Sequence, residues 1–204
     1  MVARRRLAAV LVLGAALAAH GAAQERFTKQ DADRFQVKLL RIVERGKLAR
    51  APAQAGAAAS TELTDAEVTA YLRHHARDQV PAGIVEPTLM ALGDGRVAGR
   101  AIVDLDAVRA QKQRGWLDPL AYLTGRLPLS ATGLLITQNG VGRFQLESAE
   151  LSGVTVPKTV IQELLTFYSR TPDDPDGINM DDPFELPSGI REIRVKKGNA
   201  MVIQ

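Results

Sequence analysis

The sequence predicts an α+β fold, in which two to three helices pack against a curved antiparallel sheet of about six strands arranged in hairpins. Segments between residues 85 and 203 alternate apolar and polar side chains with a period of two, which is typical of strands. Gly93-Asp94-Gly95 and Asn139-Gly140 stand between such segments and favour tight hairpin turns. Segments of helical period separate the hairpins, and this order indicates an antiparallel α+β domain.

Residues 1–23 have the organisation of a secretory signal peptide. Arg4 to Arg6 form a positively charged start, an apolar stretch runs from Leu7 to Leu17, and small residues lead to Ala23, where we expect cleavage. The apolar stretch is about half of the roughly 20 residues that a membrane-spanning helix needs, so an uncleaved anchor is the less favoured alternative. We therefore expect a periplasmic or secreted mature chain.

The charge balance of the mature chain argues against a highly charged partner such as nucleic acid. The whole chain has 26 Lys and Arg against 23 Asp and Glu, a net charge of +3. Three of the arginines lie in residues 1–23, which hold no acid, so 23 basic and 23 acidic residues remain. Such a neutral chain is not expected to bind nucleic acid. About 181 residues remain, enough for one domain with its own core.

Residues 24–49 are predicted to form a helical arm. Phe35, Leu39 and Ile42 recur at helical spacing, and Thr28 with Asp31 favours a helix start. Residues 50–60 are rich in Ala and Gly and are interpreted as a flexible linker to an α+β domain at 61–204. An arm joined in this way suggests an alternative function, a scaffold whose face of Phe35, Leu39 and Ile42 docks onto an envelope protein.

The first part of the domain is predicted as a helix followed by a hairpin. Thr64 and Glu67 have the spacing of a capping box, with Val68, Tyr71 and Leu72 as the expected buried stripe. Residues 85–92 and 96–106 are the predicted strands of the hairpin. Their alternation places Val103 and Leu105 on one face, and Arg100, Asp104 and Asp106 on the other.

The second part is predicted as a crossover at residues 107–124, two further hairpins and an intervening helix. The hairpins comprise residues 127–138 with 143–151, and residues 190–195 with 200–203. Leu129 and Leu135 share one face of the first of these strands. Pro157 opens the helix, which carries an apolar stripe, and a polar loop, 171–182, follows it. The stripe comprises Val160, Ile161, Leu164, Leu165 and Tyr168.

The residues do not provide the usual machinery of an enzyme. The chain has no Cys, and His74 and His75 are neighbours at a helix end, where they are expected to be solvated. The acidic loop between Asp173 and Asp182 does not match a calcium-binding motif, so no metal and no cofactor are predicted. Asp104 and Asp106 on one strand face leave a carboxylate-dependent hydrolase as a minor alternative to a non-enzymatic protein.

Three segments of the domain resemble a family of bacterial envelope proteins. They are Leu63-Thr-Asp-Ala-Glu-Val-Thr-Ala-Tyr-Leu72, Leu92-Gly-Asp-Gly-Arg-Val97 and Leu151-Ser-Gly-Val-Thr-Val-Pro157. Together they are similar to the tubular lipid-binding class, such as its LmeA-like and YpmS-like groups, over residues 61–204. This resemblance implies a non-enzymatic protein that holds a lipid between helix and sheet, with transient membrane contact.

Periodicity supplies the candidate ligand-binding residues for such a function. They are Val103, Leu105, Leu129, Leu135, Val160, Ile161, Leu164 and Leu165. Aliphatic side chains on one face of a curved sheet and on a facing helix have the character of a site for an acyl chain. The same pattern also describes an ordinary closed core, and the sequence leaves both readings open.

Overall fold

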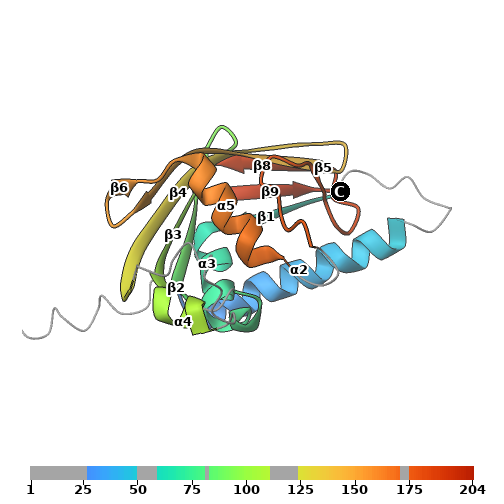
Figure 1. Cartoon of the computed structure of the whole chain (residues 1–204). Helices are drawn as coiled ribbons and strands as arrows, with labels where there is room; N and C mark the ends of the chain where they lie inside the picture. The colour runs from blue at the N-terminus through green and yellow to red at the C-terminus, as the bar shows by residue number, and fades with distance from the viewer. Residues whose placement is uncertain (1–26, 50–58, 81–82, 111–123, 171–174) are drawn as a thin grey trace, which may run out of the picture.

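The computed structural model describes residues 27–49, 59–80, 83–110, 124–170 and 175–204. In these ranges it contains nine strands and four α-helices, so the predicted α+β class is confirmed (Figure 1). The helices are α2 (Lys29–Ala49), α3 (Asp65–His74), α4 (Leu105–Ala110) and α5 (Lys158–Ser169), with a 3-10 turn at Arg77–Gln79. The strands are β1 (Ser60–Thr64), β2 (Ile84–Gly93), β3 (Arg96–Asp104), β4 (Arg126–Gln138), β5 (Val141–Leu151), β6 (Val154–Thr155), β7 (Phe184–Glu185), β8 (Glu192–Lys196) and β9 (Asn199–Ile203). The predicted signal peptide and most of the predicted linker lie outside the described residues.

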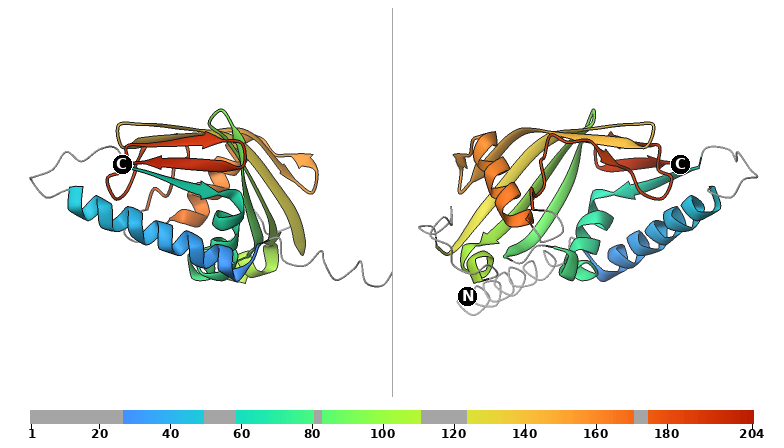
Figure 2. Two further views of the ribbon diagram at one scale, coloured as in Figure 1. Left: turned by 180° about the vertical axis from the view of Figure 1, so that it is seen from behind. Right: turned by 45° about the vertical axis from the view of Figure 1, so that its right-hand side comes forward.

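The larger sheet is antiparallel and has the order β2-β3-β4-β5-β6, with β7 paired to one end of β5. Both predicted turns are present. Asn139 and Gly140 have φ values of 52° and 83°, which is the left-handed geometry that a two-residue hairpin of this type requires. The sheet is strongly curved, and α5 lies on its concave side (Figures 1 and 2).

The last predicted hairpin lies in a separate sheet. β8 and β9 form a three-stranded sheet with β1, in the order β1-β9-β8. Ser60, which the sequence placed in the linker, pairs with Ile203 as the first residue of β1. This small sheet packs on α2 around the buried residues Ile42, Leu186 and Val202.

Helix α2 is part of this packing and is not a free arm. Phe35 lies against Tyr71 of α3 with ring centroids 4.8 Å apart, and Ile42 is only 3% exposed within the core. Lys38 donates to Glu67 at 2.7 Å. Phe35 and Ile42 thus have partners within the chain, while Leu39 between them is half-buried. The face predicted to dock onto another protein is therefore largely occupied.

Helix α3 begins as predicted but buries other residues than expected. Thr64 and Glu67 form the capping box, each side chain bonding the backbone N–H of the other. The fully buried residues are Glu67, Thr69 and Ala70, whereas Val68, Tyr71 and Leu72 are half-buried. The reason is that α3 runs along the edge of the larger sheet, between it and α2.

The predicted continuation of the strand to residue 106 is wrong. The side chain of Asp104 accepts from the backbone N–H of Ala107 at 3.0 Å, and this contact starts α4. That hydrogen bond and the Arg126 guanidinium hold the pKa of Asp104 below its usual value. Asp104 and Asp106 therefore do not share a strand face, and Leu105 is a buried helical residue. The predicted crossover begins within α4, and residues 111–123 lie outside the described ranges. No helix in those ranges is long and apolar enough to cross a membrane.

Candidate ligand-binding faces of the sheet

The concave side of the larger sheet, here called the inner face, is lined by apolar and small residues. Strand register assigns them to one face because directly paired residues point the same way. They are Ile84, Leu89, Ala91, Val97, Gly99, Ala101, Val103, Leu127, Leu129, Ala131, Gly133, Leu135, Phe144, Leu146, Ala149 and Leu151. Every one of these side chains is apolar, and the centre of the face carries the smallest ones.

Two glycines show that this face is filled at one end and open at its centre. A Cβ placed on Gly133 would stand 2.3 Å from the ring of Phe144, so that ring already fills the space above Gly133. A Cβ on Gly99 would meet only the tip of Leu89, at 4.0 Å, among the described residues. Leu89 itself is 36% exposed. Among the described residues, the centre of the inner face therefore has room beside Gly99 for at least a small side chain.

Helix α5 stands over the same side of the sheet (Figure 2). Pro157 precedes its first turn, as predicted. Gln162 fixes the following loop to the helix by donating to the carbonyl of Ile178 at 3.0 Å and accepting from the N–H of Met180 at 2.8 Å. Lys158 and Asp181 add an ion pair at 2.5 Å. These polar contacts fix the loop between Ile178 and Asp181 to one side of α5.

The structure places most of the predicted ligand-binding residues on these two surfaces. Val103, Leu129 and Leu135 lie on the inner face, although Leu135 is six residues from Leu129 along β4, roughly 20 Å away. On α5, Val160 is exposed and Ile161, Leu164 and Leu165 are half-buried. Leu105 is the exception, because it lies in α4 and is 1% exposed.

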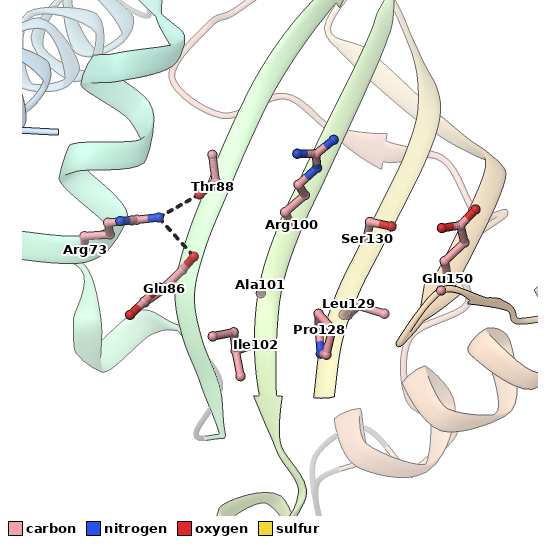
Figure 3. Close-up of a pocket in the computed structure, with 11 residues that line it drawn as sticks. Arg73, Glu86, Thr88, Arg100, Ala101, Ile102, Pro128, Leu129, Ser130 and Glu150 are labelled. Carbon is pink, nitrogen blue, oxygen red and sulfur yellow. Dashed lines mark hydrogen bonds between the residues drawn. The ribbon is translucent and has the colours of Figure 1, made fainter. Parts of the chain in front are cut away.

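The opposite, outer face carries a hollow that the sequence analysis did not identify (Figure 3). Its volume is about 420 Å³. A polar row crosses it from strand to strand, because Thr88 pairs with Arg100, Arg100 with Ser130 and Ser130 with Glu150. The signal was present in the sequence as polar residues alternating with the apolar inner set, but pairing across four strands could not be inferred from alternation alone.

Arg73 of α3 closes one end of this row. Its guanidinium donates to the carbonyls of Pro87 and Glu86, at 2.9 and 3.2 Å, and to the hydroxyl of Thr88 at 2.7 Å. The side chains of Arg100 and Glu150, in contrast, make no hydrogen bond or ion pair with any residue in the described part of the chain. The hollow thus combines one fixed guanidinium with a guanidinium and a carboxylate whose hydrogen-bonding groups are free.

The two histidines at the end of α3 make separate contacts with the start of α2. Exposed His74 contacts the carbonyl of Phe27 through Nε2 at 3.0 Å, and half-buried His75 contacts the Asp33 carboxylate at 2.6 Å. Both contact the segment at the start of α2, so His74 is exposed at the helix end as expected, whereas His75 is less solvated than expected. The described residues contain no group of three or more His, Asp or Glu that could hold a metal ion.

Comparisons with known proteins do not place the chain in a family. No protein-family model and no curated protein matches it. Among solved structures it is similar to one described as a crystal structure of lipopolysaccharide binding protein, at 14% sequence identity and a TM-score of 0.22. The similar region covers 71% of this chain and 40% of that chain. A likeness at this level supports no conclusion about function, and membership of the LmeA-like or YpmS-like groups stays a prediction.

Proposed function

We propose that this protein is a non-enzymatic binding protein for a lipid or other ligand with an apolar chain, held between the inner face of the sheet and α5. The observation that supports it most is the space above Gly99 among the described residues, in the middle of a stretch of apolar side chains on the inner face. A face of this kind in an ordinary core would be filled, because protein interiors pack to nearly crystalline density.

The inner face matches the chemistry of an acyl chain. Around Gly99 it offers apolar side chains, so it favours a ligand segment that needs no hydrogen bonds. Transfer of each methylene from water to such a face contributes about 0.8 kcal/mol. The face is shallow in side-chain height at its small residues, Gly99, Ala101 and Ala131. An acyl chain could lie there between the larger neighbouring side chains. The setting we propose is the bacterial envelope, on the basis of the signal-like residues 1–23.

The scaffold alternative has less support. It depends on an accessible face at Phe35, Leu39 and Ile42, and Phe35 and Ile42 are engaged within the chain. The hydrolase alternative depended on Asp104 and Asp106 as a pair, and these residues start a helix instead.

The substitution Gly99→Leu tests the proposal, because it places a large apolar side chain in the open space and its Cβ meets only Leu89, at 4.0 Å, among the described residues. We expect the variant to fold and to bind a fluorescent fatty acid at least about tenfold more weakly than the wild type, a change of about 1.4 kcal/mol. Ser148→Leu is the matched control, since it adds the same side chain on the exposed outer face of β5. Thermal unfolding checks that both variants are folded.

Mass spectrometry of organic extracts from the purified native protein identifies the ligand. Recovery of a stoichiometric lipid from the wild type, and less of it from Gly99→Leu, would support the proposal. Failure of the wild type to take up the probe or to carry any lipid would overturn it, as would equal binding by the two leucine variants.

A further inference from the structure

We propose a second ligand site in the hollow of the outer face, specific for a small phosphate ester that also carries an ammonium group. Phosphoethanolamine has this chemistry, either as a soluble compound or as the headgroup of a phospholipid. The site lies on the opposite side of the sheet from the inner face, and its assignment does not depend on the proposed binding of an apolar chain.

The position of the polar row supports a built site. Thr88, Arg100, Ser130 and Glu150 come from four successive strands, and the strand register points all four to the same side. In Figure 3 the side chains of Arg100 and Glu150 stand on either side of Ser130. The hollow of about 420 Å³ lies around them and is large enough for a small polar molecule.

The end of the row at Arg100 is suited to a phosphate. A guanidinium presents paired N–H groups that match two phosphate oxygens. Arg100 is exposed and has no partner in the described part of the chain, so these donors are available. Arg73 donates to the oxygen of Thr88, which leaves the Thr88 hydroxyl hydrogen to be donated to a ligand. Ser130 provides a further hydroxyl beside Arg100.

The end of the row at Glu150 is suited to an ammonium group. Glu150 lies two strands from Arg100, which separates the two backbones by about 9.5 Å. The carboxylate has no cation within ion-pairing distance in the described part of the chain. Glu86 also lines the hollow, but in Figure 3 its carboxylate lies on the side of Arg73 away from the row. Arg73 is bonded to backbone carbonyls and to Thr88, and in the described part of the chain the side chains of Arg100 and Glu150 remain as an unpaired cation and anion on either side of Ser130.

Titration of the full-length mature protein with three soluble compounds tests the site. Isothermal calorimetry or backbone NMR shifts would follow O-phosphoethanolamine, inorganic phosphate and ethanolamine. We expect affinity to decrease in that order, because only the first compound engages both ends of the row. Ligand-induced shifts are expected at Arg100, Ser130 and Glu150.

Two substitutions separate the two halves of the site. Arg100→Gln should weaken both O-phosphoethanolamine and phosphate about tenfold or more. Glu150→Gln should weaken O-phosphoethanolamine to the affinity of phosphate and leave phosphate itself unchanged. Arg96→Gln is the matched control. Arg96 is exposed on the same face of the same strand, four residues from Arg100, and does not line the hollow. It should bind as the wild type does.

Vesicles distinguish the two sources of the ligand. Sedimentation with phosphatidylcholine vesicles, with and without phosphatidylethanolamine, identifies a lipid headgroup if binding requires phosphatidylethanolamine and Arg100. Binding of soluble O-phosphoethanolamine without vesicle binding identifies a soluble ester. The proposal is overturned if the wild type shows no saturable change with O-phosphoethanolamine, or if Arg100→Gln and Glu150→Gln bind it as Arg96→Gln does.

Discussion

Glu67 is a buried acid that its neighbours keep ionised. Burial acts to raise the pKa of Glu67, but hydrogen bonds from Lys38 and from the backbone N–H of Thr64 outweigh it, and the pKa is lowered overall. Lys38 lies 2.7 Å from one carboxylate oxygen, and Arg34 lies 3.8 Å from the other. One side chain therefore caps α3 and binds α2 at the same time.

Glu67→Gln isolates the charge of this residue, because Gln can still complete a capping box. We expect the variant to lose about 1 kcal/mol of unfolding free energy at pH 7, as charged hydrogen bonds become neutral ones. A lowered pKa in the folded state means that the ionised carboxylate is stabilised by folding. The contribution is thus complete above the unfolded value near 4.5, and it is lost as the pH falls through the lower folded pKa.

Urea unfolding of the wild type and Glu67→Gln across this pH range checks the sign. The two proteins should differ at neutral pH and converge in acid. Glu62→Gln, an exposed position on β1, serves as the control and should not differ from the wild type at any pH. A constant difference between wild type and Glu67→Gln at all pH values would contradict the role assigned to the charge.

At the scale of elements, α3 supplies the hydrogen-bonding partners for the edge of β2. Asp65 accepts from the N–H of Ala91 at 2.9 Å, and Thr69 bonds both the N–H and the carbonyl of Leu89, at 3.0 and 3.2 Å. Arg73 then reaches the carbonyl of Pro87. The contacting residues recur every four residues along α3 and every two residues along β2. Four helical residues advance about 6 Å and two strand residues about 6.6 Å, so successive side chains of the helix reach successive positions of the strand.

Thr69→Val removes the middle contact of this series while it keeps the shape of the side chain. The backbone N–H and carbonyl of Leu89 would lose their partner, and we expect a loss of about 1–2 kcal/mol in unfolding free energy. Thr159→Val on the exposed side of α5 is the control for the change in helix propensity. Hydrogen exchange at the Leu89 amide should accelerate in Thr69→Val alone. Protection equal to that of the wild type would show that the contact is dispensable.

The elements that the sequence predicts correctly are those with local causes. The hairpin turn requires positive φ at two residues, which Asn139-Gly140 adopts readily, and Thr64 and Glu67 form a capping box within one helical turn. Each of these structures is therefore determined by a few neighbouring residues. β1 was missed because its partner β9 is at the far end of the chain. Leu105 was misplaced because the apolar alternation continues past Asp104, and only the hydrogen bond to Ala107 ends the strand. The two faces of β3 and β4 followed from alternation, whereas the polar row of the outer face depends on register between strands.

At the scale of the whole molecule, α2 joins the two sheets into one body. Its first half packs on α3, at the edge of the larger sheet, and Ile42 contributes to the core of the smaller sheet. The predicted division into an arm and a domain followed from the composition of residues 50–60. The composition of a segment indicates that it is a linker, but it does not indicate where the preceding helix packs. The burial of Ile42 depends on contacts with residues that are distant in the sequence.

Ile42→Asp distinguishes a structural helix from a docking arm. An unpaired carboxylate in this core should lower the unfolding free energy by about 4 kcal/mol or more and shift thermal unfolding strongly. Leu48→Asp is the control, since Leu48 is 74% exposed on the same helix and should leave stability nearly unchanged. Circular dichroism melts provide the measurement. If Ile42→Asp melted together with Leu48→Asp, α2 would be the detachable arm that the composition suggests.

The pairing between α3 and β2 also influences how the protein behaves at high concentration. A ten-residue strand at the edge of a sheet is a template onto which another chain can add a strand, and repeated addition produces aggregates. Asp65, Thr69 and Arg73 occupy the hydrogen-bonding groups that such an addition would need. Detachment of α3 would therefore expose a strand edge that can pair with another chain. Solubility in this protein depends on a few side chains of one short helix as much as on the charge of its surface.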